Sequence, residues 1–158
     1  MSDIISTPPL PASPAESKVV TGAWWPDIDV NTLRDRMNLE GEIPHARLVE
    51  AIEWGAIETI DQLATWQAAR EEEGFASLIT VDPANTVGGK TRLELLFLAA
   101  VSSYAAGRLA ERHPDLTAGR EGSERGDQRR AMADGFTASA TRAVRAIQGE
   151  ARSTSELI

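Results

Sequence analysis

One long apolar stripe of helical period, in residues 44–73, constrains the fold of this chain more than any other feature. Apolar side chains recur there at steps of three and four residues, the spacing that places them on one face of an α-helix. They are Val49, Ile52, Ala56, Ile60 and Leu63, with Trp54, Ile57, Ala64 and Ala68 widening the stripe. A helix of this length reaches about 45 Å at 1.5 Å per residue, longer than one small core requires. We therefore expect it to contact neighbours on more than one side and to pack along a partner of similar length.

The residues that flank this stripe carry helix start and stop signals. Pro44 suits the first position of the long helix, because its missing N–H costs nothing there, and Gly74 suits the end. A shorter helix is predicted over residues 30–38, capped at its start by Asp29 or Asn31. Its inward side chains are Leu33 and Met37.

Two further helices follow the long one. Residues 74–89 mix apolar side chains with Pro and Gly, which predicts an extended loop with a short hairpin. A second long helix is expected over residues 90–112, and Pro114 ends it. A polar, mobile loop then leads into a third helix over residues 127–148. Together these elements predict an all-α fold, a small helical bundle of two long helices plus a C-terminal helix.

The two ends differ from this helical part in composition. Residues 1–23 hold four prolines among Ser, Thr and Ala, and proline denies the backbone both helical and strand hydrogen bonds. We predict an extended N-terminal arm there, either a frayed end or a strap that orders on a neighbouring subunit. Residues 24–148 are expected to form the helical domain, and residues 149–158 a C-terminal tail.

Composition excludes several kinds of site. The chain has no Cys and two His, which excludes disulfides, thiolate metal sites, Cys nucleophiles and a His-rich metal site. Its net charge of −8 argues against a protein that wraps duplex DNA through phosphate contacts. No run approaches the roughly 18 apolar residues of a membrane span, and the start lacks the features of a secretory signal. We therefore expect a cytosolic product without a membrane partner.

Charge is unevenly distributed along the chain. Residues 1–107 carry 7 basic and 16 acidic side chains, whereas residues 108–158 carry 9 Arg and 8 acidic side chains. The first two thirds are therefore acidic and the last third is Arg-rich and nearly neutral. The chain presents different electrostatic surfaces to different neighbours.

One segment imitates a nucleotide-binding P-loop. An apolar run is followed by Gly88, Gly89, Lys90 and Thr91, in the order strand, Gly-rich loop, Lys-Thr and helix. The spacing fails, because the leading Gly would fall at position 84, which is Ala, and no further strands are predicted to build a parallel sheet. The two glycines are better explained as a turn, with Thr91 in the first helical turn. A nucleotide-dependent enzyme that uses Lys90 and Thr91 remains an alternative.

The remaining titratable groups do not form a catalytic or metal-binding cluster. Glu42 and His45 have the Glu-x-x-His step of carboxylate-bridged metal bundles, which need a second copy of the motif that this chain lacks. His45 is expected to be an exposed imidazole at a helix start. Carboxylate pairs such as Glu50 and Glu53 are interpreted as a solvated helix face. The sequence predicts no catalytic residue, no cofactor and no metal.

Several short motifs along the chain occur in the order seen in one protein family. They are Trp25-Pro26-Asp27-Ile28, Arg36-Met37-x-Leu39-x-Gly41, Ala46-Arg47-Leu48, Ala51-Ile52, Gly74, Gly88-Gly89-x-Thr91, Leu96-Phe97-x-x-Ala100-Val101, Leu109-x-Glu111-Arg112 and Asp115-Leu116-Thr117. Through them, over most of residues 24–148, the chain resembles the head completion (head stabilisation) proteins of tailed phages, the GPL type. Residues 118–126 depart from the family pattern, because several Arg replace a Thr-rich, Gly-containing loop.

The resemblance implies a structural virion protein rather than an enzyme. It implies a helical head–tail connector, or adaptor, whose copies form a ring of twelve beneath the portal. Such a ring would extend the DNA channel, help to retain the packaged genome and receive the tail. The implied partners are the portal protein, neighbouring copies, a tail-side neck or tail terminator protein, and packaged DNA that passes through the lumen without sequence-specific binding. The implied location is the virion neck at the portal vertex, after assembly in the bacterial host cytoplasm.

Residues near the two ends are the candidates for these contacts. They are Trp24, Trp25, Pro26, Asp27, Leu157 and Ile158. The two Trp are expected either to anchor the arm on a neighbour or to be buried in their own bundle, since both environments favour Trp. Leu157 and Ile158 are the candidates to insert into the portal. The alternative function is a free-standing helical interaction module or regulator.

Overall fold

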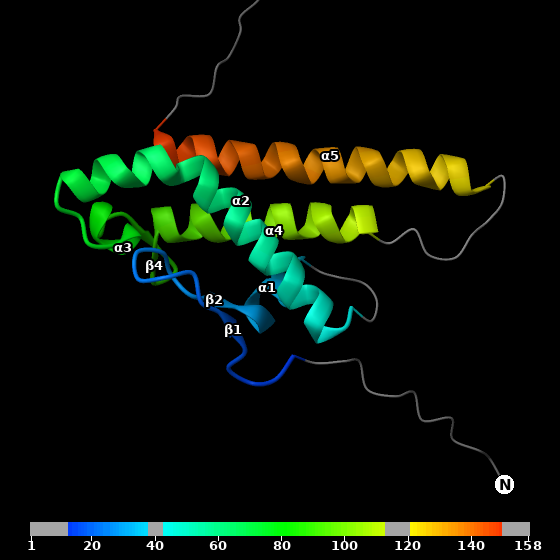
Figure 1. The fold of residues 1–158 in the computed structure, drawn as a ribbon, viewed down its shortest axis with the longest axis horizontal. Helices are drawn as coiled ribbons and strands as arrows, with labels where there is room; N and C mark the ends of the chain where they lie inside the picture. Colours follow the sequence, from blue (N-terminus) through cyan, green and yellow to red (C-terminus); the bar gives the residue numbers. More distant parts are fainter. Residues whose placement is uncertain (1–12, 38–42, 113–120, 150–158) are drawn as a thin grey trace, which may run out of the picture.

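The computed structural model describes residues 13–37, 43–112 and 121–149, and helices make up most of this part of the chain (Figure 1). Its helices, in chain order, are α1 (Val30–Met37), α2 (His45–Glu72), α3 (Leu78–Val81), α4 (Arg92–Arg112) and α5 (Glu121–Gln148). Within the same residues, short strands form two antiparallel pairs, β1 (Lys18–Val19) with β2 (Ile28–Asp29) and β3 (Thr86–Val87) with β4 (Lys90–Thr91). The prediction of a mainly helical fold is confirmed.

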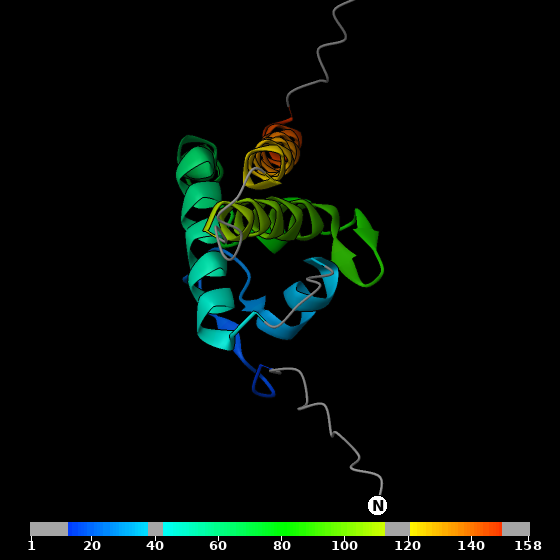
Figure 2. The same cartoon turned by 90° about the vertical axis from the view of Figure 1, so that its right-hand side faces the viewer.

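Helix α4 lies in the middle of the fold (Figure 2). Helix α5 lies along one side of α4 and runs in the opposite direction, and α2 crosses α4 from a second side. The N-terminal segment and α1 cover the side of α4 that faces away from α5. Phe97 and Val101 of α4 are fully buried and belong to one core cluster with Leu33 of α1 and Ile52 of α2. The core is therefore built around α4.

Helix α4 is also strongly apolar. The sequence predicts no stretch that approaches a membrane span, but among the described residues α4 alone is long and apolar enough to cross a membrane, with a mean hydropathy of 1.3 in Arg92–Glu111. Half of that stretch is buried inside the fold. Its place between α2, α5 and the N-terminal segment accounts for the composition, because a central helix contacts neighbours on all sides.

Helix α2 begins one residue later and ends one residue earlier than predicted. Pro44 is its N-cap, and at its other end the N–H groups of Gly74 and Phe75 donate to the carbonyls of Glu71 and Arg70. Gly74 has a φ of +95°, a left-handed conformation that favours glycine at a helix end. The end signal at Gly74 is confirmed, whereas Pro44 lies at the N-cap and not at the first helical position expected for it.

The crossing of α2 and α4 is close because a glycine lies at the contact. A Cβ placed on Gly55 would lie 2.5 Å from the backbone oxygen of Val101 and 3.1 Å from the backbone nitrogen of Ala105. Only glycine fits at this separation. One turn later the buried Thr59 donates its hydroxyl to the Gly55 carbonyl at 2.8 Å. Figure 1 shows α2 changing direction along its length, and a hydroxyl bond of this type is one cause of such bends.

Helix α5 packs on α4 mainly through small side chains. Its buried residues are Ala133, Ala140, Ala143, Val144 and Ile147. A Cβ on Gly107 of α4 would meet the Phe136 Cβ at an ordinary 3.6 Å, so this contact is looser than the α2–α4 crossing. The first turns of α5 run past the end of α4 (Figure 1).

Helix α5 begins earlier than the sequence predicts. The expected loop extends to residue 126, whereas the structure places residues 121–126 in the helix. The polar composition favours a loop, but the sequence has Glu at positions 121 and 124, and carboxylates suit the positive end of a helix. A helix that packs by one side at the surface also tolerates many polar residues.

The predicted hairpin lies at residues 86–91, so α4 begins at Arg92 and not at residue 90 as expected. Residues 74–89 also contain one element that was not predicted. The hairpin consists of β3 and β4, joined by Gly88 and Gly89, whose φ values of +58° and +79° suit a tight turn. The segment Leu78–Val81, expected to be extended, forms the short helix α3 instead. The Ser77 N–H donates to the Thr80 hydroxyl at 3.2 Å and caps this helix. Burial of Leu78 in the core holds the turn in place.

Helix α1 confirms the short helix predicted over residues 30–38, although residue 38 itself lies outside the described residues. Asp29 is its cap, because its Oδ1 accepts the Thr32 N–H at 2.6 Å. This backbone hydrogen bond lowers the pKa of Asp29, since it stabilises the charged carboxylate. As predicted, Leu33 is buried, and Met37 packs partly buried against the core.

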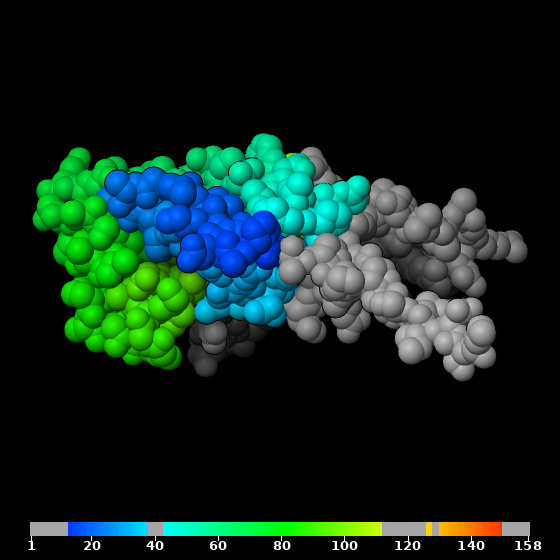
Figure 3. Space-filling view, turned by 90° about the horizontal axis from the view of Figure 1, so that it is seen from below, coloured from blue at the N-terminus to red at the C-terminus, as the bar shows by residue number. Residues whose placement is uncertain are grey.

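Residues 13–23, expected to belong to an extended arm, are packed against the helices. Strand β1 pairs with β2, and Val19 is buried in the core. The Ser13 side chain is buried against Arg34 of α1 and His45 of α2. Figure 3 shows this segment (blue) lying against the start of α2 (cyan). Pairing and burial make it part of the folded domain, whereas residues 1–12 of the arm and 150–158 of the tail lie outside the described residues.

Candidate interaction surfaces

Trp24 and Trp25, the candidate anchors of the arm, lie in the core, where they are 7% and 5% exposed. Trp24 packs edge-on against Trp25 and Trp66, with ring centroids 4.6 and 5.9 Å apart. Trp25 stacks on Phe97 of α4 at 4.9 Å. Aromatic pairs of this kind contribute about 0.5–1.5 kcal/mol beyond the burial of their area. Of the two environments that the sequence leaves open, the structure shows burial within the chain's own bundle.

Both indole N–H groups are satisfied inside the chain. Trp24 Nε1 donates to the Phe75 carbonyl at 3.3 Å, and Trp25 Nε1 donates to Gln67 Oε1 of α2 at 3.0 Å. The backbone N–H of Leu78 also donates to the Trp24 carbonyl at 2.9 Å. The two Trp therefore join the N-terminal segment to the end of α2 and to α3, and neither ring is presented to a partner in this conformation.

The other candidates near Trp25 have a modest role in the structure. Pro26 is half-buried and Asp27 is exposed. Lys18 Nζ lies 2.7 Å from Asp27 Oδ2, and this hydrogen bond with a carboxylate raises the pKa of Lys18. Because both side chains are exposed, the pair adds little stability. Leu157 and Ile158 lie outside the described residues.

The Gly-Gly-Lys-Thr segment has structural roles. Thr91 is buried and caps α4: its hydroxyl accepts the Glu94 N–H at 3.2 Å, and its own N–H donates to Glu94 Oε2 at 2.7 Å. This reciprocal pair is a capping box, and the Thr-x-x-Glu pattern at positions 91–94 is the sequence signal that predicts it. Lys90 Nζ lies 4.0 Å from Glu94 Oε1. Lys90 and Thr91, the residues that a nucleotide-dependent enzyme would use, therefore belong to the β3–β4 hairpin and to the cap of α4.

His45 is half-buried, in contrast to the exposed imidazole that the sequence predicts. Its Nδ1 lies 2.9 Å from the Ser13 hydroxyl, and its Nε2 lies 3.5 Å from the Ser17 hydroxyl. Arg34 donates to the same Ser13 hydroxyl at 3.1 Å and to the Ile43 carbonyl at 3.0 Å. These contacts attach the start of α2 to the N-terminal segment. In the described ranges, no three His, Asp or Glu side chains are grouped to hold a metal ion.

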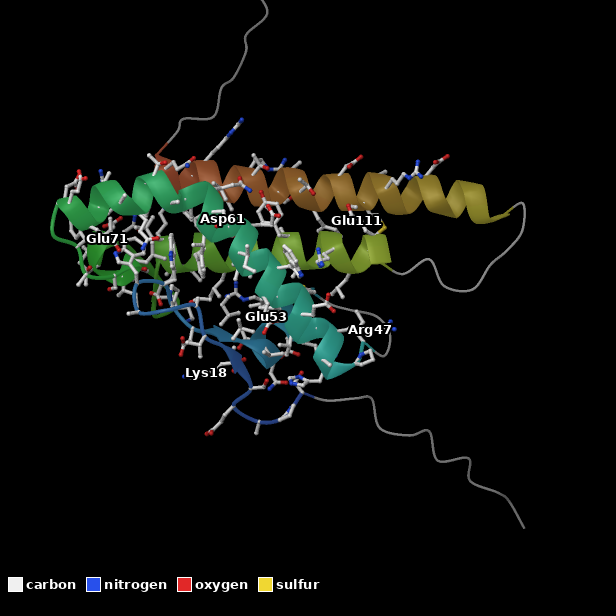
Figure 4. The ribbon with its side chains drawn as sticks, viewed as in Figure 1. Lys18, Arg47, Glu53, Asp61, Glu71 and Glu111 are labelled. Atoms are coloured by element: carbon white, nitrogen blue, oxygen red, sulfur yellow. The ribbon has the colours of Figure 1, made fainter. Side chains whose placement is uncertain are left out.

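The outer side of α2 is a candidate contact surface. Trp54 is 41% exposed and Ile57 is 47% exposed, although both side chains are large and apolar. The carboxylates of Glu53, Glu58 and Asp61 on the same helix are exposed as well, and Figure 4 labels Glu53 and Asp61. We call these five residues the α2 face. An apolar centre with charged residues around it is typical of a surface that docks against a partner of complementary charge.

A surface pocket of about 230 Å³ adjoins the α2 face. Its lining includes Trp54 and Glu58 of α2, Tyr104 and Arg108 of α4, and Thr137 of α5. The Arg108 guanidinium lies 4.3 Å from the centroid of the Trp54 ring, and Arg108 Nη2 lies 3.7 Å from Glu50 Oε1. This cation–π contact and ion pair hold the Trp54 ring in one orientation. The exposed apolar surface is therefore preorganised.

The sequence predicts part of this surface. The wide apolar stripe indicates that Trp54 and Ile57 contact neighbours, but it does not distinguish neighbours within the chain from partners outside it. Large exposed apolar residues also occur singly elsewhere, at Val20, Ile79, Val87 and Met132. Scattered residues of this kind are normal on a protein surface. The α2 face differs because two large exposed apolar residues, Trp54 and Ile57, lie close together on one helix and have carboxylates beside them.

Comparison with known proteins identifies a family. The family model for the phage head completion protein (GPL) matches residues 19–158. The "Head completion/stabilization protein" of Escherichia phage P2 is 33% identical over 129 residues, which cover 82% of this chain and 76% of that protein. No solved structure matches the chain. Since the family match extends over most of the sequence, the chain belongs to the phage head completion protein (GPL) family.

Proposed function

We propose that this chain is a structural subunit of the virion neck, where its copies form a ring beneath the portal. The observation that carries the proposal is the family match over residues 19–158. A relative named for head completion and stabilization adds support, because it is 33% identical over most of both chains. In this role the ring extends the DNA channel, helps to retain the packaged genome and receives the tail.

The helical architecture supports a role in stacking subunits. Helices α2 and α5 each have 28 residues, which corresponds to about 42 Å at 1.5 Å per residue. Each helix buries one side in the domain and leaves the other side exposed. A subunit of a ring contacts its two neighbours through two different surfaces, and two long helices of equal length can supply both.

The charge of the chain supports a lumen along which DNA slides. The net charge is −8, and carboxylates make none of the phosphate contacts that hold DNA through counterion release. The proposed partners are the portal protein, neighbouring copies in a dodecamer, a tail-side neck or tail terminator protein, and the DNA in the lumen. Assembly takes place in the bacterial host cytoplasm.

Co-sedimentation with purified portal rings tests this function. We expect the full chain to sediment with the rings and to add density beneath them in electron micrographs, whereas the chain without portal stays in the slower fraction. A chain that never sediments with portal would refute the neck role and favour a free-standing interaction module or regulator.

Two N-terminal deletions test whether the arm is a strap. Deletion of residues 1–12 leaves the packing of Ser13 and Val19 intact, so we expect a normally folded chain that assembles less well on portal. Deletion of residues 1–20 also removes β1, so it should lower the free energy of unfolding as well. Unchanged assembly after the shorter deletion would count against the strap.

A further inference from the structure

We infer that the pocket beside the α2 face binds the proline-rich arm, residues 1–12, of a second copy of this chain. We call this site the Trp54 pocket, and its lining includes Trp54, Tyr104, Arg108 and Thr137. The inference rests on the proposed function and deepens it, because it names the contact by which neighbouring copies of a ring hold each other.

The size of the Trp54 pocket suits a short stretch of peptide rather than a small-molecule ligand. Its volume of about 230 Å³ is below the roughly 300–1,000 Å³ that is usual for small-molecule sites. Gly55 and Gly107 belong to its lining and have no side chains to fill it, and Trp54 and Tyr104 are its aromatic lining residues. Aromatic-lined grooves bind proline-rich segments, because such segments are extended before they bind and lose little entropy.

The pocket offers hydrogen-bond donors that lack an acceptor. Among the residues that the structure describes, no acceptor pairs with the indole N–H of Trp54. The Tyr104 hydroxyl accepts a hydrogen bond from Gln62 Nε2 at 2.6 Å, which leaves its own hydrogen free to donate. The charge of Arg108 is already opposed by Glu50 at 3.7 Å. The pocket therefore suits an occupant that brings acceptors and no charge.

The arm supplies acceptors without charge. Residues 4–12 contain no charged side chain. Residues 8–11, Pro-Pro-Leu-Pro, have four carbonyls and one N–H, that of Leu10, because proline has none. In the polyproline II conformation that such a sequence favours, three residues make a turn, so Pro8 and Pro11 lie on one edge and can pack on aromatic rings together. The arm complements the pocket in shape and in hydrogen bonding.

The arm and the pocket lie on different sides of the domain. The described chain begins at Ser13, whose hydroxyl lies 2.9 Å from Nδ1 of His45 at the start of α2. The N-terminal segment covers the side of α4 that faces away from α5, whereas Thr137 of α5 belongs to the pocket lining. His45 and Trp54 are nine residues apart, which is about two and a half turns, so they project from opposite sides of α2.

The length of the arm excludes its own pocket. A path over α2 from His45 to Trp54 advances about 14 Å along the axis and passes halfway round a helix about 10–12 Å wide, a total of about 21–23 Å. Residues 8–13 span at most about 18 Å when fully extended, so Pro8 and Pro11 both fall short. The pocket of a neighbouring copy has no such limit. An arm on one side and a pocket on the other make a heterologous contact, which repeats and closes into a ring when the rotation permits.

The C-terminal tail also begins near the pocket, but its charge does not suit it. Gln148 at the end of α5 donates to the carbonyl of Gln62, the residue that bonds Tyr104, at 3.2 Å. Residues 150–158 carry two Glu against one Arg. The pocket lining has Glu58 and Glu111, so the tail would add like charges. The uncharged arm avoids this repulsion.

Disulfide trapping tests the contact in the full-length chain, which has no cysteine of its own. One variant carries Leu10→Cys, between the two prolines, and the other carries Glu58→Cys, in the pocket lining. Mild oxidation of an equimolar mixture should join positions 10 and 58 of different copies, which mass spectrometry of the digested product identifies. Val87→Cys in place of Glu58→Cys is the control, since Val87 is 64% exposed and lies outside the pocket lining. The 10–58 disulfide should form about tenfold or more faster than the 10–87 disulfide, because docking raises the local concentration.

Further changes separate recognition from chance collision. Trp54→Ala added to the Glu58→Cys chain removes the ring, and Pro8→Ala with Pro11→Ala added to the Leu10→Cys chain removes the prolines of one edge. Each should lower the rate of the 10–58 disulfide to that of the control. Pro9→Ala is the matched change on another edge of the arm and should leave the rate unchanged. Circular dichroism checks that every variant is folded.

Each outcome decides the inference. A fast 10–58 disulfide that depends on Trp54 and on the two prolines supports it, even in a chain that does not bind portal, in which case the proposed function alone is refuted. A rate no higher than that of the control overturns it. It is also overturned if a chain with both Leu10→Cys and Glu58→Cys forms the disulfide faster within one copy than between copies. A fast disulfide from Ser155→Cys in place of Leu10→Cys would overturn it too and assign the pocket to the tail.

Discussion

Replacement of Gly55 by Ala tests whether backbone contact sets the distance between α2 and α4. The new methyl group would lie 2.5 Å from the Val101 carbonyl oxygen, so the two helices would have to move apart by close to an ångström to restore an ordinary contact of 3.4 Å or more. The opposing atom belongs to the backbone of α4, the central helix, and no change of rotamer can relieve the clash. The helices therefore have to separate along their shared core.

The net effect follows from two opposing terms. Alanine is the better helix former, and an exposed Gly→Ala change in a helix stabilises by about 1 kcal/mol. Overpacking in a well-packed core costs about 1–3 kcal/mol, and the upper end applies where the clash is with backbone. We expect Gly55→Ala to lower the free energy of unfolding by about 2 kcal/mol, equivalent to a fall in Tm of about 4–8 °C for a domain of this size.

Two other glycines provide matched controls on the same scaffold. A Cβ on Gly135 of α5 meets nothing within 4 Å, so Gly135→Ala should gain stability from helix propensity alone, about 0.5–1 kcal/mol. At Gly107 the nearest atom is at an ordinary 3.6 Å, so Gly107→Ala should be tolerated. Urea unfolding followed by Trp fluorescence and circular dichroism measures all three. If Gly55→Ala is as stable as wild type, the crossing is not set by backbone contact.

Three further changes test individual interactions. Asp29→Ala should lower stability by about 1 kcal/mol because α1 loses its cap, and Asn, also a good cap, should lose less. The Thr32 N–H lowers the pKa of Asp29 in the folded chain below its unfolded value of about 3.8. The stability that the carboxylate adds is therefore complete above the unfolded pKa and is lost as pH falls through the lower folded pKa. Urea unfolding at pH 7 and at pH 3 measures this loss. Trp25→Phe keeps a ring on Phe97 but removes the bond to Gln67, so thermal unfolding should show a loss of about 1 kcal/mol; no loss would contradict the role of that bond. Thr91→Val should destabilise the start of α4 by about 1 kcal/mol, and nucleotide-dependent thermal stabilisation of the wild-type chain would contradict a purely structural Thr91.

Features that depend on neighbouring residues could be predicted from the sequence alone. The start of α2 after Pro44, its end before Gly74, the cap at Asp29 and the Gly88-Gly89 turn are each decided by a few adjacent residues and their backbone preferences. The order of motifs was also sufficient to indicate the family, because that order can be read directly from the sequence. The start of α5 was the main local error, since polar composition is common to loops and to surface helices.

Whether each Trp faces the core or the solvent was decided only by the tertiary structure. Trp24 and Trp25 are buried while Trp54 is exposed, although all three are indoles in apolar stretches of sequence. Their burial depends on partners far along the chain, such as Phe97 for Trp25, and no local pattern encodes those contacts. The attachment of Ser13 to His45 has the same origin. Local sequence determines most of the helix ends, whereas the choice between burial and free surface for residues such as the Trp side chains arises from packing between distant segments.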